Sequence, residues 1–159
     1  MFRVLRAAPA AASVLTILAL GGCATVPADV DGTTDRISGG VLRVGITANP
    51  PWTDLSGAEP TGTEVELIEG FAREQDAEIE WTEGSESVLA DALHEGALDV
   101  AVGGFTDDTP FMDKAALTDV YTETRAPAGT EKHVMLARAG ENRLLVTLEE
   151  YLRANGARS

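Results

Sequence analysis

The side chains best suited to binding chemistry lie in one short stretch, DVAVGGFTDDTPF, which spans residues 99–111. Its apolar first half is typical of a buried strand and runs directly into Gly103 and Gly104. Two consecutive glycines let a ligand approach the backbone closely. Oxygen-bearing side chains follow at once, namely Thr106, Asp107 and Asp108. The stretch therefore predicts a binding loop that favours cations.

Catalytic chemistry has little support in the sequence, and we predict that the chain is not an enzyme. The simplest interpretation makes His94 a solvated helix residue and His133 a residue at the start of a strand. The acidic pairs at 107–108 and 149–150 could serve acid–base or metal chemistry, but such pairs usually lie on solvated surfaces. The sequence has no phosphate-binding glycine loop, zinc-ligand spacing or nucleophile elbow. We therefore predict no metal site and no cofactor.

Three strand patterns alternate with two helical patterns upstream of and within this loop. The strands are expected at 41–47, 78–83 and 97–105, and the helices after a capping box at 63–66 and after Ser85 or Ser87. This order predicts a parallel sheet with right-handed crossovers, whose ligands bind beyond the carboxyl ends of the strands. Residues 47–52, which end in Trp52, and residues 103–108 should therefore share one rim.

The remainder of the chain is less regular. We expect a short helical turn at 109–116, an extended segment at 117–121, a linker at 122–132, a strand at 133–138 and a helix from Asn142 to Gly156. Gly70, inside the first predicted helix, indicates tight packing at that point, because glycine is otherwise unfavourable there. The folded part is expected to span residues 41–155 as one domain of ordinary size.

The N-terminal segment predicts export. Residues 1–22 carry two arginines before a short apolar run and small residues, which is the pattern of a secretory signal. Residues 20–23 resemble the lipobox of bacterial lipoproteins, so Cys23, the single cysteine, is predicted to carry acyl chains such as palmitate that anchor the chain to the membrane. The alternative is an ordinary signal peptide in which Cys23 is incidental. Residues 23–40 lack periodicity and are predicted to form a flexible tether.

The charge balance excludes one class of partner. With 26 acidic and 12 basic residues, the formal net charge is −14. Because nucleic-acid phosphates are neutralised by lysine and arginine, we predict no nucleic-acid binding.

Several segments together resemble the solute-binding proteins of family 3, the amino-acid receptors of bacterial ABC importers. The matching segments are LRVGIT with NPPW, GTEVEL, ALHEGALDVAVGGFT, LTDVY and, as a returning strand and helix, HVMLARAGENRLLVTLEEYL. The resemblance implies an α/β fold of the type II periplasmic-binding-protein class, with three layers and a mostly parallel sheet flanked by helices. Family members are two-lobed clamps. All these segments belong to the first lobe, so the second lobe is missing between about residues 122 and 132, either by deliberate closure of the first lobe or through gene decay or a sequence error.

The resemblance also implies a ligand site. Trp52 would stack on the ligand, and the Gly104 carbonyl and Thr106 hydroxyl would bind an ammonium group. Phe111 stands where the family has an arginine that grips the ligand carboxylate, and a phenyl ring cannot replace a bidentate guanidinium. The ligand-binding residues are therefore expected to be Trp52, Gly104, Phe105, Thr106, Asp107 and Phe111.

These expectations favour a membrane-anchored receptor on the extracytoplasmic side, in the periplasm or at the cell surface. It would bind a small amino-acid-like or cationic solute and have an ABC permease among its expected partners. Since one lobe covers only one side of a ligand, loss of half the free energy of a micromolar site leaves roughly millimolar binding. The alternative is an interaction or sensory module whose open rim, with Trp52, Phe105 and Phe111 exposed, docks a protein partner.

Overall fold

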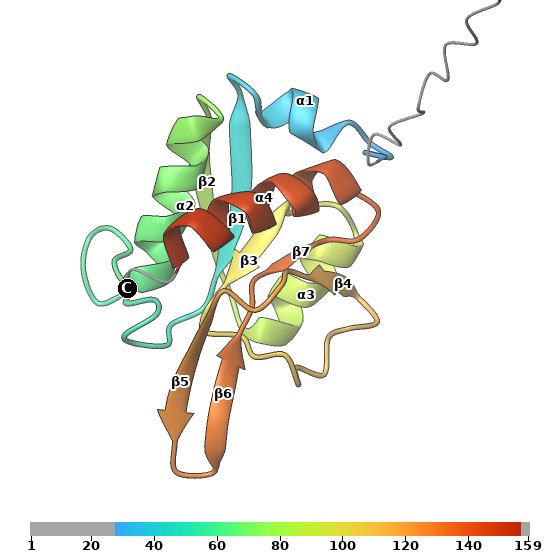
Figure 1. Ribbon diagram of the computed structural model, residues 1–159. Coiled ribbons are helices and arrows are strands. Elements are labelled where there is room, and N and C mark those ends of the chain that lie inside the picture. Colours follow the sequence, from blue (N-terminus) through green and yellow to red (C-terminus); the bar gives the residue numbers. More distant parts are fainter. Residues whose placement is uncertain (1–27, 157–159) are drawn as a thin grey trace, which may run out of the picture.

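The computed structural model describes residues 28–156, which pack around one five-stranded sheet (Figure 1). The strand order is β2-β1-β3-β7-β4; β1, β2 and β3 are parallel, and β7 is antiparallel to both β3 and β4. The sheet strands are β1 Val41–Ile46, β2 Glu78–Glu83, β3 Val100–Val102, β4 Ala115–Leu117 and β7 Leu136–Arg138. The helices are α1 Thr33–Ile37, α2 Thr63–Glu74, α3 Glu86–His94 and α4 Asn142–Asn155.

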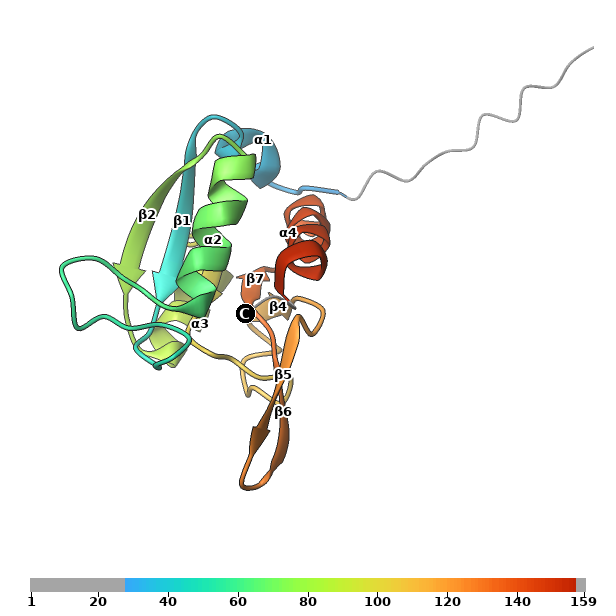
Figure 2. The ribbon, with the colours of Figure 1, turned by 60° about the vertical axis from the view of Figure 1, so that its left-hand side comes forward.

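Helices cover both faces of the sheet, which gives the three layers that were expected (Figure 2). Val100 and Val102 of β3 belong to the core that also contains buried residues of α1, α2 and α4. Ala101, between them, belongs to the second core, under α3. The alternation follows from the two-residue period of a strand. The predicted α/β fold with a mostly parallel sheet is confirmed.

The predicted linker at 122–132 is wrong, because these residues form a β-hairpin. β5 Thr122–Ala126 pairs antiparallel with β6 Gly129–His133, in a register from Thr122↔His133 to Ala126↔Gly129. The hairpin projects from the end of the sheet where β1 and β3 finish (Figure 1). Composition was misleading because the hairpin is polar and is held by its own backbone hydrogen bonds, not by a buried apolar face. His133 consequently ends a strand, and the predicted strand at 133–138 is reduced to β7.

The predicted tether is also corrected where it can be compared with the structure. Residues 28–40 pack on the domain, and Ile37 of α1 is completely buried in the first core. The side chain of Arg36 pairs with the buried Asp99, which directly precedes β3, with 2.5 Å between Nη2 and Oδ1. The folded part therefore begins before residue 41. The signal segment, Cys23 and residues 24–27 lie outside the described residues.

Two helix starts differ from the sequence expectation. Thr63 is the first residue of α2, follows an N-cap at Gly62, and makes no capping bond to the helix; Glu64 is buried with no exposed surface. In α4, Asn142 lies inside the helix, after an N-cap at Glu141. The predicted capping box is therefore not formed, because Thr63 lies inside the helix and its hydroxyl donates to Pro51 O at 3.4 Å.

The expected tight packing at Gly70 is present. A Cβ atom built on Gly70 would lie only 1.9 Å from the hydroxyl of Tyr151 in α4. The absent side chain thus lets α2 and α4 approach each other. This contact helps to hold α2, whose first turn reaches the binding rim.

Candidate functional site

The rim is formed by the segments that follow β1 and β3. Thr47 N donates to Val102 O at 3.2 Å, and the Asn49 amide Nδ2 donates to Gly103 O at 2.8 Å. Gly104 has φ +70°, and a Cβ there would lie 2.5 Å from both Asn49 Nδ2 and Trp52 Cδ1. Only glycine suits this conformation and this space. Residues 103–108 are called the glycine loop from here on. The expectation that Trp52 and this loop share one rim is confirmed by the contact at Gly104.

A buried carboxylate fixes the glycine loop from below. Glu64 Oε2 accepts hydrogen bonds from Gly103 N at 2.7 Å and Gly104 N at 2.9 Å, and Oε1 accepts one from the Tyr121 hydroxyl. Burial raises the pKa of Glu64, and the bonds from Tyr121 and the two glycines oppose that shift. Burial likewise raises the pKa of Tyr121, with the adjacent Glu64 acting in the same direction.

Sequence reasoning missed Glu64 as a residue of the site. It lies within the predicted capping box at 63–66 and was given no role of its own, although an acidic residue at the start of a helix that follows the rim loop can turn toward unpaired backbone N–H groups nearby. In the structure it positions the loop, because it joins α2, the end of β3 and the segment before β5.

The indole of Trp52 is half-buried and lies on the imidazole of His133. The two ring centroids are 3.9 Å apart and the planes are inclined by 36°. His133 is 1% exposed, and its Nε2 is 2.8 Å from the Thr124 hydroxyl. Burial lowers the pKa of His133, while Glu131 and the backbone of Gly104 oppose that change. His133 was not among the predicted site residues, although the structure places it against one of them.

The polar part of the rim lies beside this ring pair. The Thr106 hydroxyl donates to Asp108 Oδ1 at 2.6 Å, which leaves its lone pairs able to accept from a ligand. Asp107 faces the hairpin instead, where its carboxylate is 3.8 Å from Lys132 Nζ. A shallow cleft of about 150 Å³ is lined by Gly104, Thr106, Asp108 and Glu86, together with Phe105, Thr109 and Pro110. The cleft therefore presents two exposed carboxylates, from α3 and from the loop.

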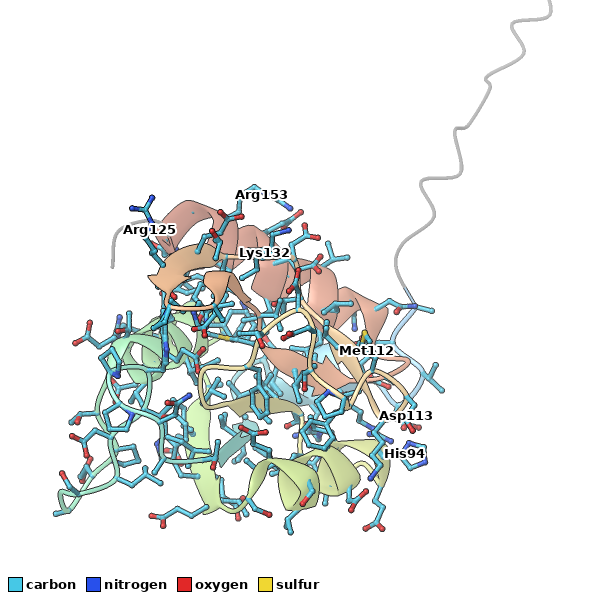
Figure 3. All side chains as sticks on the ribbon, turned by 90° about the horizontal axis from the view of Figure 1, so that it is seen from below. His94, Met112, Asp113, Arg125, Lys132 and Arg153 are labelled. Atoms are coloured by element: carbon cyan, nitrogen blue, oxygen red, sulfur yellow. The ribbon has the colours of Figure 1, made fainter. Side chains whose placement is uncertain are left out.

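The predicted exposure of the loop aromatics is partly wrong. Phe105 is 3% exposed and packs in the second core, and Phe111 is partly buried against the same core. The chain turns after Gly104, so the Phe105 side chain points under α3 while its backbone pairs with Val134. Met112 is the exposed apolar residue here, with 62% exposure. Figure 3 places Met112 near His94, away from Arg125 and Lys132 of the hairpin.

Three further observations concern other kinds of site. A hollow of about 790 Å³ lies beside β2 and α2, lined by residues such as Arg73, Glu78 and Trp81, and none of the rim residues contributes to it. Within residues 28–156, no three or more His, Cys, Asp or Glu side chains are grouped to hold a metal ion. None of the helices in that range is both long and apolar enough for a membrane span.

Comparison with family models and with solved structures points to one protein family. The model of the bacterial extracellular solute-binding proteins, family 3, matches residues 42–154. A search of curated proteins gave no match. Among solved structures, a point mutant of arginine-bound domain 1 of TmArgBP, the T. maritima protein, has a TM-score of 0.68 at 25% identity, with 76% of this chain and 96% of that chain covered. The same domain without the mutation gives 0.67 at 24% identity, with 76% and 97% covered. An ancestral cationic amino acid solute binding protein gives 0.66 at 16% identity, with 77% and 93% covered.

Proposed function

Because the chain belongs to the bacterial extracellular solute-binding proteins of family 3, we propose that it is a single-lobe receptor for a cationic amino acid or a related amine. The observation that carries this proposal is the rim at Gly104, which the indole of Trp52 contacts and which also lines the cleft that holds the Thr106 hydroxyl and the Asp108 carboxylate. An aromatic face with nearby carboxylates is suited to a guanidinium or ammonium group.

The similar structures support a site on one lobe. The T. maritima structures consist of domain 1 alone and are described as arginine-bound, and this chain covers nearly the whole of that domain. A single lobe of this fold therefore suffices to hold arginine in that protein. We propose the same arrangement for this chain, with the roughly millimolar affinity expected for a site with one wall.

The replacement of arginine by Phe111 gives the proposal a distinctive consequence. Phe111 is half-buried against the second core and offers no donor to a carboxylate. The ligand should therefore be recognised through its side-chain cation and not through its α-carboxylate. Agmatine, which is arginine without the carboxylate, is expected to bind at least as tightly as arginine, and glutamate is expected not to bind.

Calorimetric titration of residues 28–159 with these three ligands at millimolar concentration tests the proposal. Trp52→Ala should weaken arginine binding about tenfold, since a desolvated cation–π contact contributes about 1 to 2 kcal/mol. Trp81→Phe is the matched control, because Trp81 lies on β2, away from the rim. This variant should bind arginine with unchanged affinity. Absence of heat with both arginine and agmatine, or equal binding of glutamate, would contradict the proposal.

We also propose that the receptor is held at the extracytoplasmic face of a membrane through lipid on Cys23, with an ABC permease as its transport partner. The support is the signal pattern of residues 1–22 and the lipobox-like segment at 20–23, since family 3 proteins are extracellular. In a bacterial host, the full chain should incorporate an alkyne-labelled palmitate, whereas Cys23→Ser should incorporate none. Equal labelling of both chains would contradict lipid attachment at Cys23.

A second candidate is a protein-docking module, and the projecting β5–β6 hairpin favours it. Glu123, Arg125, Thr130 and Lys132 share one face of the hairpin by register, and all four are exposed. The burial of Phe105 removes one of the aromatic contacts on which this alternative was based. Loss of a membrane partner on Arg125→Glu, in a chain that binds neither arginine nor agmatine, would favour docking over solute binding.

A further inference from the structure

His133 occupies an unusual place for a histidine without an assigned role. It ends β6, pairs with Thr122 of β5, and forms an isolated bridge with Thr106 of the glycine loop. Its side chain is 1% exposed, although the hairpin to which it belongs is otherwise largely exposed. The imidazole is therefore enclosed between the hairpin, the glycine loop and Trp52.

The contacts of the imidazole determine how the indole is held. One face of Trp52 lies against the imidazole, at 3.9 Å between centroids, and the indole edge meets Gly104. The Thr124 hydroxyl holds Nε2 at 2.8 Å, so the imidazole cannot turn without breaking that bond. The remaining surface of the half-buried indole is what the rim can offer to a ligand.

We propose that His133 is a positioning residue that fixes the indole of Trp52 for cation binding, and that a proton on His133 opposes the binding of a cationic solute at the same indole. This inference rests on the proposed function. A ligand cation on the indole would be separated from the imidazole only by the indole ring, so protonation places two like charges on opposite faces of one ring. Proton and ligand therefore compete by linkage.

Charged groups around the imidazole influence the equilibrium between the neutral and protonated forms of His133. Those near it are Glu131 and Lys132 on β6, Asp107 and Asp108 on the glycine loop, and Glu64 beneath that loop. Glu131 Oε2 lies 4.0 Å from Nε2 and favours the protonated form. Lys132 is paired with Asp107. Burial dominates and lowers the pKa of His133, so the neutral form prevails near neutral pH and is lost only as pH falls below the ordinary value of 6.5.

The test uses Trp81→Phe, which leaves Trp52 as the only tryptophan of a chain that has two. Trp52 fluorescence is followed from pH 8 to pH 4.5, and arginine is titrated at both ends of that range. Fluorescence should be quenched as His133 protonates, and arginine affinity should fall about tenfold or more at the acidic end. His133→Phe should keep an aromatic backing for the indole and lose both pH dependences, and His133→Ala should weaken binding at pH 8.

Glu131→Gln provides a variant with little risk to folding, because the Glu131 side chain is 53% exposed. Removal of this carboxylate should move the midpoints of fluorescence and of binding together to lower pH. Unshifted midpoints, or pH dependence that persists in His133→Phe, would overturn the inference. In a second outcome, arginine fails to bind while Trp52 fluorescence still follows the protonation of His133. This result would overturn the proposed function and the competition, and would leave only the contact between the two rings. A flat fluorescence profile overturns the positioning role whether or not arginine binds.

Discussion

Replacement of Asp99 by alanine is expected to lower the free energy of unfolding by about 3 kcal/mol, because it removes a buried acceptor that two partly exposed arginines and a backbone N–H share. The Asp99 side chain has no exposed surface. It accepts bonds from Arg36 Nη2 at 2.5 Å, from Arg43 Nη2 at 2.6 Å and from Arg43 N at 2.9 Å. The loss can be measured by urea unfolding at pH 7.

The matched control is Asp91→Ala. Asp91 also pairs with a cation, Lys114 Nζ at 2.6 Å, but its side chain is 57% exposed, so water can replace the partner. A chain that starts at Val41 should lose stability comparably to Asp99→Ala, since it lacks Arg36 and the buried Ile37. If the chains that start at residues 28 and 41 are equally stable, residues 28–40 are a tether after all.

Replacement of Glu64 by alanine is expected to lower the free energy of unfolding by about 3 kcal/mol. It would leave three donors, Gly103 N, Gly104 N and the Tyr121 hydroxyl, without an acceptor where little water can reach them. The glycine loop should also lose its fixed shape, so arginine binding should weaken together with stability. Glu66→Ala, at an exposed position on the same helix, should change neither property.

The contribution of Glu64 to the stability of the unmodified chain depends on pH with a definite sign. The pKa of Glu64 is raised by burial, so the folded state holds the proton more tightly than the unfolded state. The contribution of Glu64 to stability is therefore largest below its ordinary pKa of about 4.5 and declines as pH rises through the raised value. Glu64→Gln should remove this decline. An unchanged pH profile in Glu64→Gln would contradict the assignment of the raised pKa to this carboxyl group.

The part of the fold that was predictable from the sequence is the part with clear periodicity. β1 and β2 alternate, and α2 and α4 repeat their apolar residues with the helical period. The parallel pairing of the first three strands follows from the alternation of strands with helices. The hairpin and α1 were missed for a different reason. Their sequences are polar, and α1 has only one buried apolar residue, Ile37, beside the buried Thr33. It is otherwise held by ion pairs with residues distant in the chain, such as Asp99.

The candidate site was predictable only at the level of the backbone. The carboxyl ends of parallel strands meet at one edge, and the expected proximity of Trp52 and Gly104 is correct. The direction of each side chain was not predictable, because Phe105 turns into the core after two glycines and Glu64 turns inward from a helix start. The contact of His133 with Trp52 depends on the hairpin, so a prediction that treated 122–132 as a linker could not contain it.

Amide chemical shifts of residues 28–159, followed by nuclear magnetic resonance during an arginine titration to tens of millimolar, test the central claim most directly. The account predicts saturable shifts at Gly103, Gly104 and Thr106 and at the indole N–H of Trp52, with the indole N–H of Trp81 unaffected. Shifts that do not saturate, or that centre on β2 and the hollow beside it, would contradict the claim that this single lobe binds its solute at the rim.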